Sequence, residues 1–249
     1  YLFQVNLALM LFYLLYTLLL KGDTFLHLRR FFFLSAIIFS LLYPLFTIPE
    51  LSDVWRFRFH ALKDLEATVI FGNPAMSRVI EDPTAVSSIR IPWEQILTGL
   101  YMSITLFFVV RFFWQLISIM RIRLQSEKRM IVGIAFFQLK NDMTPFSFFK
   151  LIFIHTEKHS ETEIEQILLH EHTHVRQWHS VDIMLIELLF LFSWWNPFVW
   201  LMKREMAMNL EYLADNGVLR EGIDSREYQF HLLRLTYHET AVQIVNNFN

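Results

Sequence analysis

The sequence contains no cysteine in its 249 residues. This absence excludes a disulfide framework, a zinc finger of the cysteine type and a catalytic thiol. Any metal ion must therefore be bound by histidine and carboxylate side chains. The chain also lacks a strong net charge, and its formal value of -2 excludes the basic surface that general nucleic-acid binding requires. A glycine-rich phosphate loop and internal repeats are absent as well.

Apolar residues are abundant. They make up 54% of the chain, which includes 26 phenylalanines, and the mean hydropathy is positive. An average soluble domain is less apolar than this, so the composition favours a protein of the membrane. The length is sufficient for one or two domains, each with a core of its own.

Three apolar runs are long enough to cross a bilayer, namely residues 2–20, 31–48 and 96–120. Basic residues follow the first run and the third run, and such residues favour the cytoplasmic side of a membrane. We therefore expect the N-terminus and the loop of residues 49–92 on the extracytoplasmic side, and everything after residue 120 on the cytoplasmic side.

His170 and His174 belong to a His-Glu-x-x-His sequence, in which Glu171 follows the first histidine. Residues four apart lie on one face of a helix, so the two imidazoles can bind one metal ion. Glu171 can then reach a water molecule at the open position of that ion, as in zinc hydrolases of peptide bonds. The alternative is a polar helix face that carries histidines by chance.

A third protein ligand is expected, because catalytic zinc sites keep three protein ligands and one open position. His172 and His179 lie off the metal-facing side of such a helix, and we expect His179 to be a surface or core histidine. Glu211 is the better candidate. Asp215 lies four residues later on the same helix face, where it can accept a hydrogen bond from the far nitrogen of a ligand histidine. The alternative for this pair is an acidic patch on a helix surface.

The apolar segment 183–200 lies between these candidate ligands and has the length of a fourth span. If it crossed the bilayer, His174 and Glu211 would lie on opposite sides and could not share a metal ion. We therefore expect a hairpin that turns at Asn196-Pro197, since proline disfavours helix at the preceding residue. The apolar surface of this hairpin must pack on the membrane helices or enter the lipid.

Residues 130–139 and 151–155 are rich in Ile, Val and Phe, and we expect them to form short strands. Ser160 and Glu163 form a candidate capping box for a helix over residues 161–177. The His-Glu-x-x-His sequence would thus lie on a helix that follows strands.

Four motifs, in this order along the chain, resemble a known family. They are His170-Glu-His-Thr-His174, Asp182-Ile-Met-Leu185, Trp195-Asn-Pro-Phe-Val-Trp200 and Glu211-Tyr-Leu-Ala-Asp215. Together they are similar to the BlaR/MecR-type membrane metallopeptidases, the bacterial sensor-transducers of β-lactam signalling and their relatives. The resemblance is firm over residues 164–219 and looser over the three upstream spans.

The predicted fold is mainly α and integral to the membrane. Three transmembrane helices in a region of residues 1–120 precede a small α+β gluzincin metalloprotease domain of residues 121–249, which contains a membrane-embedded helical hairpin. The resemblance places this domain on the cytoplasmic side.

The resemblance also implies roles for particular residues. It implies Zn²⁺ bound by His170, His174 and Glu211, with Glu171 as the catalytic base and Asp215 hydrogen-bonded to a ligand histidine. It further implies that Phe146, Ser147 and Phe148 form an edge strand that binds the substrate. For stabilisation of the oxyanion, the candidates are His231 and Arg234 on the last expected helix.

We expect a zinc endopeptidase that performs limited proteolysis of a cytoplasmic or membrane-proximal regulator in signal transduction. The resemblance implies a multi-pass protein of the bacterial cytoplasmic membrane and a protein substrate such as a transcriptional repressor. The lipid bilayer is a further partner, a second copy in a homodimer is an option, and direct binding of nucleic acid is not expected.

Two alternatives to this function stay open. The first is a non-catalytic membrane transducer in which zinc is only a structural brace. The presence of Glu171 argues against it, since a structural site has no need of that carboxylate. The second is a quality-control protease that cuts many unfolded membrane proteins.

Overall fold

The computed structural model describes residues 1–46, 92–157, 159–226 and 228–229. Three of its helical segments are long and apolar enough to cross a membrane. They are α1 (Leu2–Leu19), α2 (Leu26–Leu42) with the short 3-10 helix η1 (Tyr43–Leu45), and α4 (Trp93–Gln125). The chain is therefore a multi-pass membrane protein. The expected outer loop of residues 49–92 lies outside the described residues, apart from Pro92.

The second span begins earlier than its apolar run suggests. α2 starts at Leu26 rather than at residue 31, and its first turns include Arg29 and Arg30. Arg29 donates hydrogen bonds to backbone carbonyls at the end of α1, and Arg30 is paired with Asp182. The helix can continue through both arginines because each guanidinium group has partners within the protein.

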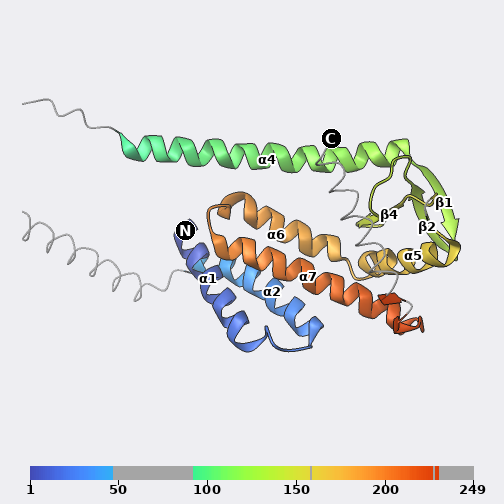
Figure 1. The fold of residues 1–249 in the computed structure, drawn as a ribbon. Coiled ribbons are helices and arrows are strands. Elements are labelled where there is room, and N and C mark those ends of the chain that lie inside the picture. The colour runs from blue at the N-terminus through green and yellow to red at the C-terminus, as the bar shows by residue number, and fades with distance from the viewer. Residues whose placement is uncertain (47–91, 158, 227, 230–249) are drawn as a thin grey trace, which may run out of the picture.

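α1 and α2 pack in one bundle with two helices from the far end of the sequence, α6 (His179–Ser193) and α7 (Pro197–Arg220) (Figure 1). The four helices share one apolar core. Its most deeply buried side chains include Tyr16 and Phe33 from the first pair of helices, and Ile186, Met202 and Met206 from the second pair. Close packing of these side chains holds α6 and α7 against the membrane helices, because helices in lipid associate through packing and interhelical hydrogen bonds.

α6 and α7 form the predicted hairpin. α6 ends at Ser193 and α7 begins at Pro197, and the side-chain oxygen of Asn196 caps α7 by accepting a hydrogen bond from the backbone N–H of Phe198 at 2.9 Å. The side-chain nitrogen of Asn196 donates to the Oδ1 of Asn6 in α1 at 2.8 Å. The hairpin tip thus lies beside the beginning of α1, and the chain returns along the same bundle.

The outer surface of the hairpin is apolar too. Phe192, Trp195 and Trp200 are each about half exposed. Large exposed apolar side chains of this kind are unfavourable in water and suit a lipid environment. This observation supports the prediction that the hairpin lies within the membrane.

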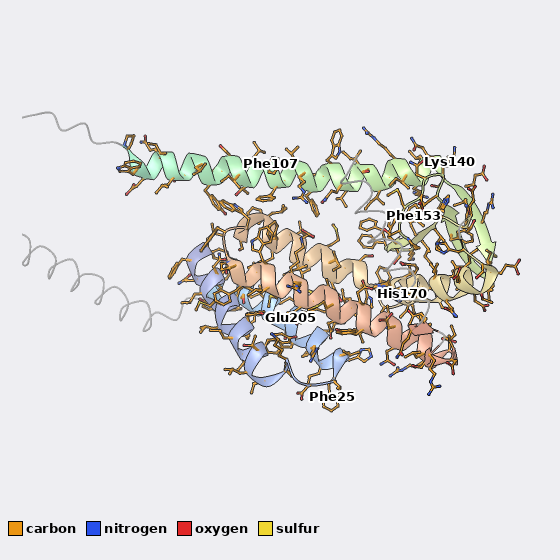
Figure 2. All side chains as sticks on the ribbon, in the orientation of Figure 1. Phe25, Phe107, Lys140, Phe153, His170 and Glu205 are labelled. Atoms are coloured by element: carbon orange, nitrogen blue, oxygen red, sulfur yellow. The ribbon has the colours of Figure 1, made fainter. Side chains whose placement is uncertain are left out.

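α4 runs beside α6, on the side away from α7 (Figure 1). The contact is mainly aromatic: the ring of Trp194 stacks on Tyr101, and its indole N–H donates to the hydroxyl of Thr105 at 3.2 Å. Many other side chains of α4 are exposed, among them Phe107 (Figure 2). In the most apolar stretch of this helix, only 11% is buried, so most of the helix surface is available to lipid.

A four-stranded sheet follows α4 directly. Its strands are β1 (Glu127–Ile131), β2 (Ile134–Gln138), β3 (Phe146–Phe148) and β4 (Leu151–Ile154), in the spatial order β1-β2-β4-β3. β2 and β4 pair in parallel, and the other two pairs are antiparallel. The sheet is therefore mixed, and β3 forms one of its edges.

Residues 130–139, which we expected as one strand, form a hairpin instead. The chain reverses at Val132 and Gly133, whose φ angles are 49° and 75°, and β1 pairs with β2 on either side. Two successive positive φ angles are typical of a two-residue hairpin turn. Valine seldom adopts this conformation, so the sequence does not reveal the turn.

α5 (Glu161–Arg176) packs against the sheet through a second apolar core. Phe136, Ile152 and Ile154 of the sheet meet Ile164 and Leu168 of the helix. The predicted capping box is confirmed, because the side chain of Ser160 accepts from the N–H of Glu163 and the Glu163 carboxylate accepts from the N–H of Ser160. The predicted fold class, three membrane helices with a small α+β unit, is likewise confirmed.

Candidate metal centre

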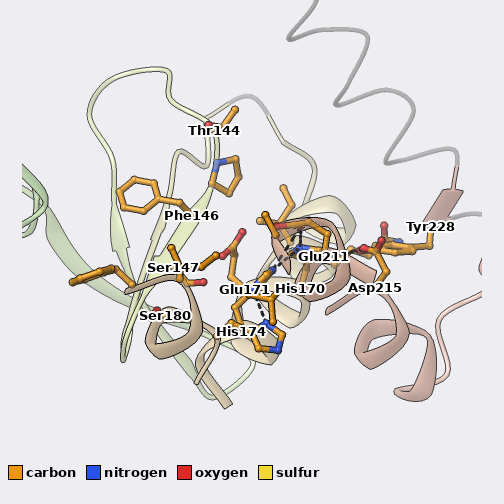
Figure 3. A pocket seen from close by; sticks show the side chains of 18 residues that line it. Thr144, Phe146, Ser147, His170, Glu171, His174, Ser180, Glu211, Asp215 and Tyr228 are labelled. Carbon is orange, nitrogen blue, oxygen red and sulfur yellow. Dashed lines mark hydrogen bonds and ion pairs between the residues drawn. The ribbon is translucent and has the colours of Figure 1, made fainter. Parts of the chain in front are cut away.

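His170 and His174 project from one face of α5, as their spacing predicts (Figure 3). Their Nε2 atoms are 3.2 Å apart. Glu211 approaches from α7, and its Oε2 lies 3.3 Å from the Nε2 of His170 and 3.8 Å from that of His174. Among the residues that the structure describes, these three form the group that could hold a metal ion.

The distances between these atoms suit a tetrahedral zinc ion. Zinc lies about 2.0–2.2 Å from histidine nitrogen and carboxylate oxygen, so two such ligands at a tetrahedral angle are roughly 3.3–3.6 Å apart. The three separations above lie around this range. Two imidazoles and one carboxylate also form a donor set that catalytic zinc uses. The residues therefore fit zinc, and the same donors accept other divalent transition metals.

The far nitrogen of His170 is held by two side chains. Its Nδ1 lies 3.1 Å from the Oδ1 of Asp215 and 2.9 Å from the hydroxyl of Tyr228. That hydroxyl also donates to Asp215 at 2.8 Å. A carboxylate at this position keeps the proton on Nδ1 and leaves Nε2 free to bind a cation. Asp215 thus occupies the predicted place, whereas Tyr228 was not predicted.

The far nitrogen of His174 is held by another histidine. Its Nδ1 lies 2.9 Å from the Nδ1 of His179, which is only 2% exposed. Burial lowers the pKa of His179 to about 3, and the electrostatic interactions with His174 and Arg30 add to this effect. His179 is therefore a neutral core histidine that contacts a candidate ligand. From the sequence, His179 was expected off the metal-facing side. Its contact with His174 results from the turn after α5, which the structure shows.

The helices that carry the candidate ligands approach closely at one point. A Cβ atom added to Gly217 of α7 would lie 2.6 Å from the Cγ2 of Thr173 on α5 and 2.7 Å from its Oγ1. Both distances are shorter than van der Waals contact allows. Glycine at this position therefore permits the helix spacing at which Glu211 reaches the two histidines.

The electrostatics of the site favour a positive charge. Burial by itself lowers the pKa of the His170 imidazole. Hydrogen bonds with Asp215 and Glu211, together with the charge of Glu171, outweigh burial and raise this pKa to about 10. The pKa of the Glu211 carboxyl is lowered, mainly by hydrogen bonds with His170 and His174. A metal cation at this place would replace the proton that the carboxylates otherwise retain on the imidazole.

A cavity of about 510 Å³ opens beside the three candidate ligands. Edge strand β3 forms one wall, and Glu171 points into the cavity on that side (Figure 3). Gln166, one helical turn before His170, lines the same cavity, and its buried Oε1 has no hydrogen-bond partner among the described residues. The cavity therefore combines a metal-binding group, a carboxylate and an unpaired backbone edge.

The two predicted oxyanion residues, His231 and Arg234, lie outside the described residues. Tyr228, the unpredicted contact of His170, is close to them in the sequence but carries no local signal of its role. Its position depends on how the chain folds back after α7, which no short motif encodes.

Comparison with known proteins adds a family to this geometry. Residues 150–247 match the family described as BlaR1 peptidase M56, and this match covers β4, α5, α6 and α7. It includes all three side chains of the candidate metal group. No curated protein matches the sequence. The chain therefore carries a domain of the BlaR1 peptidase M56 family over residues 150–247.

Proposed function

We propose that this protein is a membrane-embedded zinc endopeptidase that cuts a cytoplasmic or membrane-proximal regulator at a small number of sites. One observation carries the proposal: the Nε2 atoms of His170 and His174 and the Oε2 of Glu211 converge beside Glu171, at the wall of a cavity. The match to a peptidase family supports the same reaction class.

In the proposed reaction, Glu171 is the proton carrier. Zinc, when bound by His170, His174 and Glu211, supplies Lewis acidity toward the scissile carbonyl and toward a water molecule. Glu171 accepts the proton of the attacking water and then donates it to the nitrogen of the leaving amine. Glu171 is 8% exposed as a whole residue and lines the cavity, so it can meet a bound peptide without being widely solvated.

The substrate is expected to bind as an extended strand beside β3. Phe146, Ser147 and Phe148 lie at the edge of the sheet, and an edge strand has unpaired backbone groups that can pair with another chain. Gln166 also lines the cavity and offers a buried amide oxygen, which can accept a hydrogen bond from a peptide N–H. Only an unfolded or flexible segment of a protein can enter in this way.

The position of the site limits which proteins it can meet. α4 ends in a basic stretch, with Arg121 and Arg123 before β1, and such residues favour the cytoplasmic side of a membrane. The sheet follows this stretch directly, and α5, which carries two of the candidate ligands, packs on the sheet. A substrate must therefore reach the inner membrane surface, and this requirement favours a regulator over bulk cytoplasmic protein.

The main experiment compares wild type with Glu171→Gln, in cells and as purified full-length chain. The variant should keep its zinc, measured by atomic absorption, because no ligand is changed. New protein N-termini, mapped by mass spectrometry, should be generated in wild-type cells and be missing in the variant. A few fragments support a signalling protease. Zinc loss in the variant, or the same fragments in both strains, contradicts the catalytic role of Glu171.

Two other functions make different predictions in this experiment. For a transducer with structural zinc, wild type and Glu171→Gln would give identical fragment patterns. For a quality-control protease, the variant would accumulate many damaged membrane proteins rather than lose a few fragments. The presence of a buried carboxylate beside the candidate ligands favours the endopeptidase over the first of these.

The proposed topology can be tested by single-cysteine labelling, since the native chain has no cysteine. Cysteines at Ser160 and Arg220, which are exposed before α5 and at the end of α7, should react from the same, cytoplasmic side. A cysteine at Ser87, between the second and third spans, should react from the other side. Labelling of Ser160 and Arg220 from opposite sides would refute a hairpin that returns.

A further inference from the structure

The turn between α5 and α6 connects the candidate metal group to the membrane helices. α5 ends at Arg176 and α6 begins at His179, so this turn follows His174 by only a few residues. Trp178 has left-handed backbone angles there, with φ 58° and ψ 34°. This backbone conformation is unfavourable for residues other than glycine, and it persists only where contacts with neighbouring residues impose it.

Arg30 of membrane helix α2 supplies such contacts. Its Nε lies 2.6 Å from the Oδ2 of Asp182, its Nη2 lies 3.2 Å from the Oδ1, and the same Nη2 donates to the backbone carbonyl of Gln177 at 2.6 Å. Asp182 is 2% exposed, and the side chain of Arg30 is 19% exposed. The guanidinium group thus binds both ends of the turn with a planar, two-armed geometry that a lysine cannot reproduce.

His179 connects the turn that Arg30 binds with the candidate ligand His174. Its Nδ1 lies 2.9 Å from the Nδ1 of His174, and its Nε2 lies 3.2 Å from the side-chain oxygen of Gln177. If Nε2 of His174 binds a metal, the proton of that ring resides on Nδ1 and is donated to His179. The proton of His179 then resides on Nε2 and is donated to Gln177. Every donor in this series has an acceptor, so the contacts define one orientation of the His174 ring.

The two candidate histidine ligands are therefore supported from different places. His170 is supported by Asp215 of α7 and by Tyr228, which follows α7 in the sequence. His174 is supported by His179, and the turn that holds His179 is bound by Arg30 of α2. Among the described residues, the support of His174, unlike that of His170, includes a residue of a membrane-spanning helix.

We propose that Arg30 is a positioning residue for the metal centre: it fixes the turn between α5 and α6, and thereby the orientation of His174. The second membrane helix then sets part of the coordination geometry. A displacement of α2 that removes Arg30 from the Gln177 carbonyl releases His179 and changes the ligand angle at the metal. This inference rests on the proposed metal-binding function and adds a route from the membrane to it.

The test uses the purified full-length chain in detergent micelles with Co²⁺ as the probe, because its visible spectrum reports coordination geometry. Arg30→Lys keeps the charge but cannot bind Asp182 and Gln177 in the same two-armed way. We expect about tenfold weaker Co²⁺ binding, as for the loss of other groups that orient metal ligands, together with a changed spectrum. Arg29→Lys is the matched control, because the neighbouring Arg29 donates its hydrogen bonds to the backbone carbonyls of Leu20, Lys21 and Asp23, between α1 and α2.

A double variant separates positioning from general destabilisation. If Arg30 acts through His179, then Arg30→Lys combined with His179→Gln should bind Co²⁺ no more weakly than His179→Gln alone. Additive losses, or a wild-type spectrum and affinity in Arg30→Lys, would overturn the inference. If Arg30→Lys lacks the wild-type helical content by circular dichroism, Asp182→Asn replaces it under the same criteria. Failure of the wild-type chain to bind Co²⁺ would instead refute the metal site itself.

Discussion

The close contact between α5 and α7 gives a sharp prediction for Gly217→Ala. The added Cβ would lie 2.6 Å from the Cγ2 of Thr173, about 0.8 Å short of the 3.4 Å at which ordinary contact begins. Thr173 has little freedom to move aside, because its side chain is branched at Cβ and its hydroxyl donates to the Leu169 carbonyl at 2.9 Å. The two helices must therefore separate.

The separation should affect metal binding more than folding. Overpacking costs about 1–3 kcal/mol, and replacing a helical glycine by alanine returns about 1 kcal/mol, so the net loss of stability is roughly 1 kcal/mol. Metal–ligand distances, in contrast, tolerate only about 0.2 Å. A helix shift several times larger removes Glu211 from the two histidines, and the metal affinity should fall by at least about tenfold.

The assay is zinc affinity by competition with a chromophoric chelator, beside thermal unfolding without metal. Thr173→Ala removes the two nearest atoms, so the double variant with Gly217→Ala should recover most of the affinity. Gly99→Ala on α4 is the control, because an added Cβ there meets nothing within 4 Å. Wild-type zinc affinity in Gly217→Ala, or no recovery in the double variant, would refute the argument that this glycine sets the distance between the candidate ligands.

Further predictions concern the candidate ligands and their supports. Glu211→Ala should lose bound zinc in an atomic absorption measurement, and full occupancy would exclude Glu211 as a ligand. Asp215→Asn should weaken zinc binding by about 10–100-fold, since the proton on His170 is no longer fixed by a carboxylate. Tyr228→Phe should have a smaller effect in the same competition assay, because Asp215 still contacts His170 directly. Removal of zinc by a chelator should lower the thermal unfolding temperature. Zinc at 100 times its dissociation constant stabilises the folded state by about 2.7 kcal/mol, and the chelator removes this stabilisation. An unchanged unfolding temperature would contradict binding of zinc to the folded state.

Features set by local geometry could be predicted from the sequence. The shared face of His170 and His174 follows from helical periodicity, and the start of α5 follows from the capping box at Ser160. The return of the hairpin at Asn196-Pro197 was inferred from a geometric requirement and not from helix propensity. His174 and Glu211 had to lie on the same side of the membrane to share one metal ion. Geometry of this kind is carried by a few neighbouring residues.

Features set by distant parts of the chain could not be predicted in this way. The contact of Arg30 with the turn after α5 joins residues about 150 positions apart, and nothing near either residue indicates the other. Tyr228 was missed for the same reason. The hairpin turn at Val132 was missed for a local reason, because a β-branched residue with positive φ contradicts the usual preference of its side chain.

The common core of α1, α2, α6 and α7 has a consequence for any attempt to isolate the peptidase. A fragment that begins at residue 121 would retain all three candidate ligands, yet Ile186, Val199, Met202 and Met206 would lose the partners that now bury them. Such a fragment would expose these apolar side chains to water and aggregate rather than form a soluble domain. The domain of residues 150–247 is therefore not a detachable module, and proteolytic cleavage ahead of it would not release a soluble domain from the membrane.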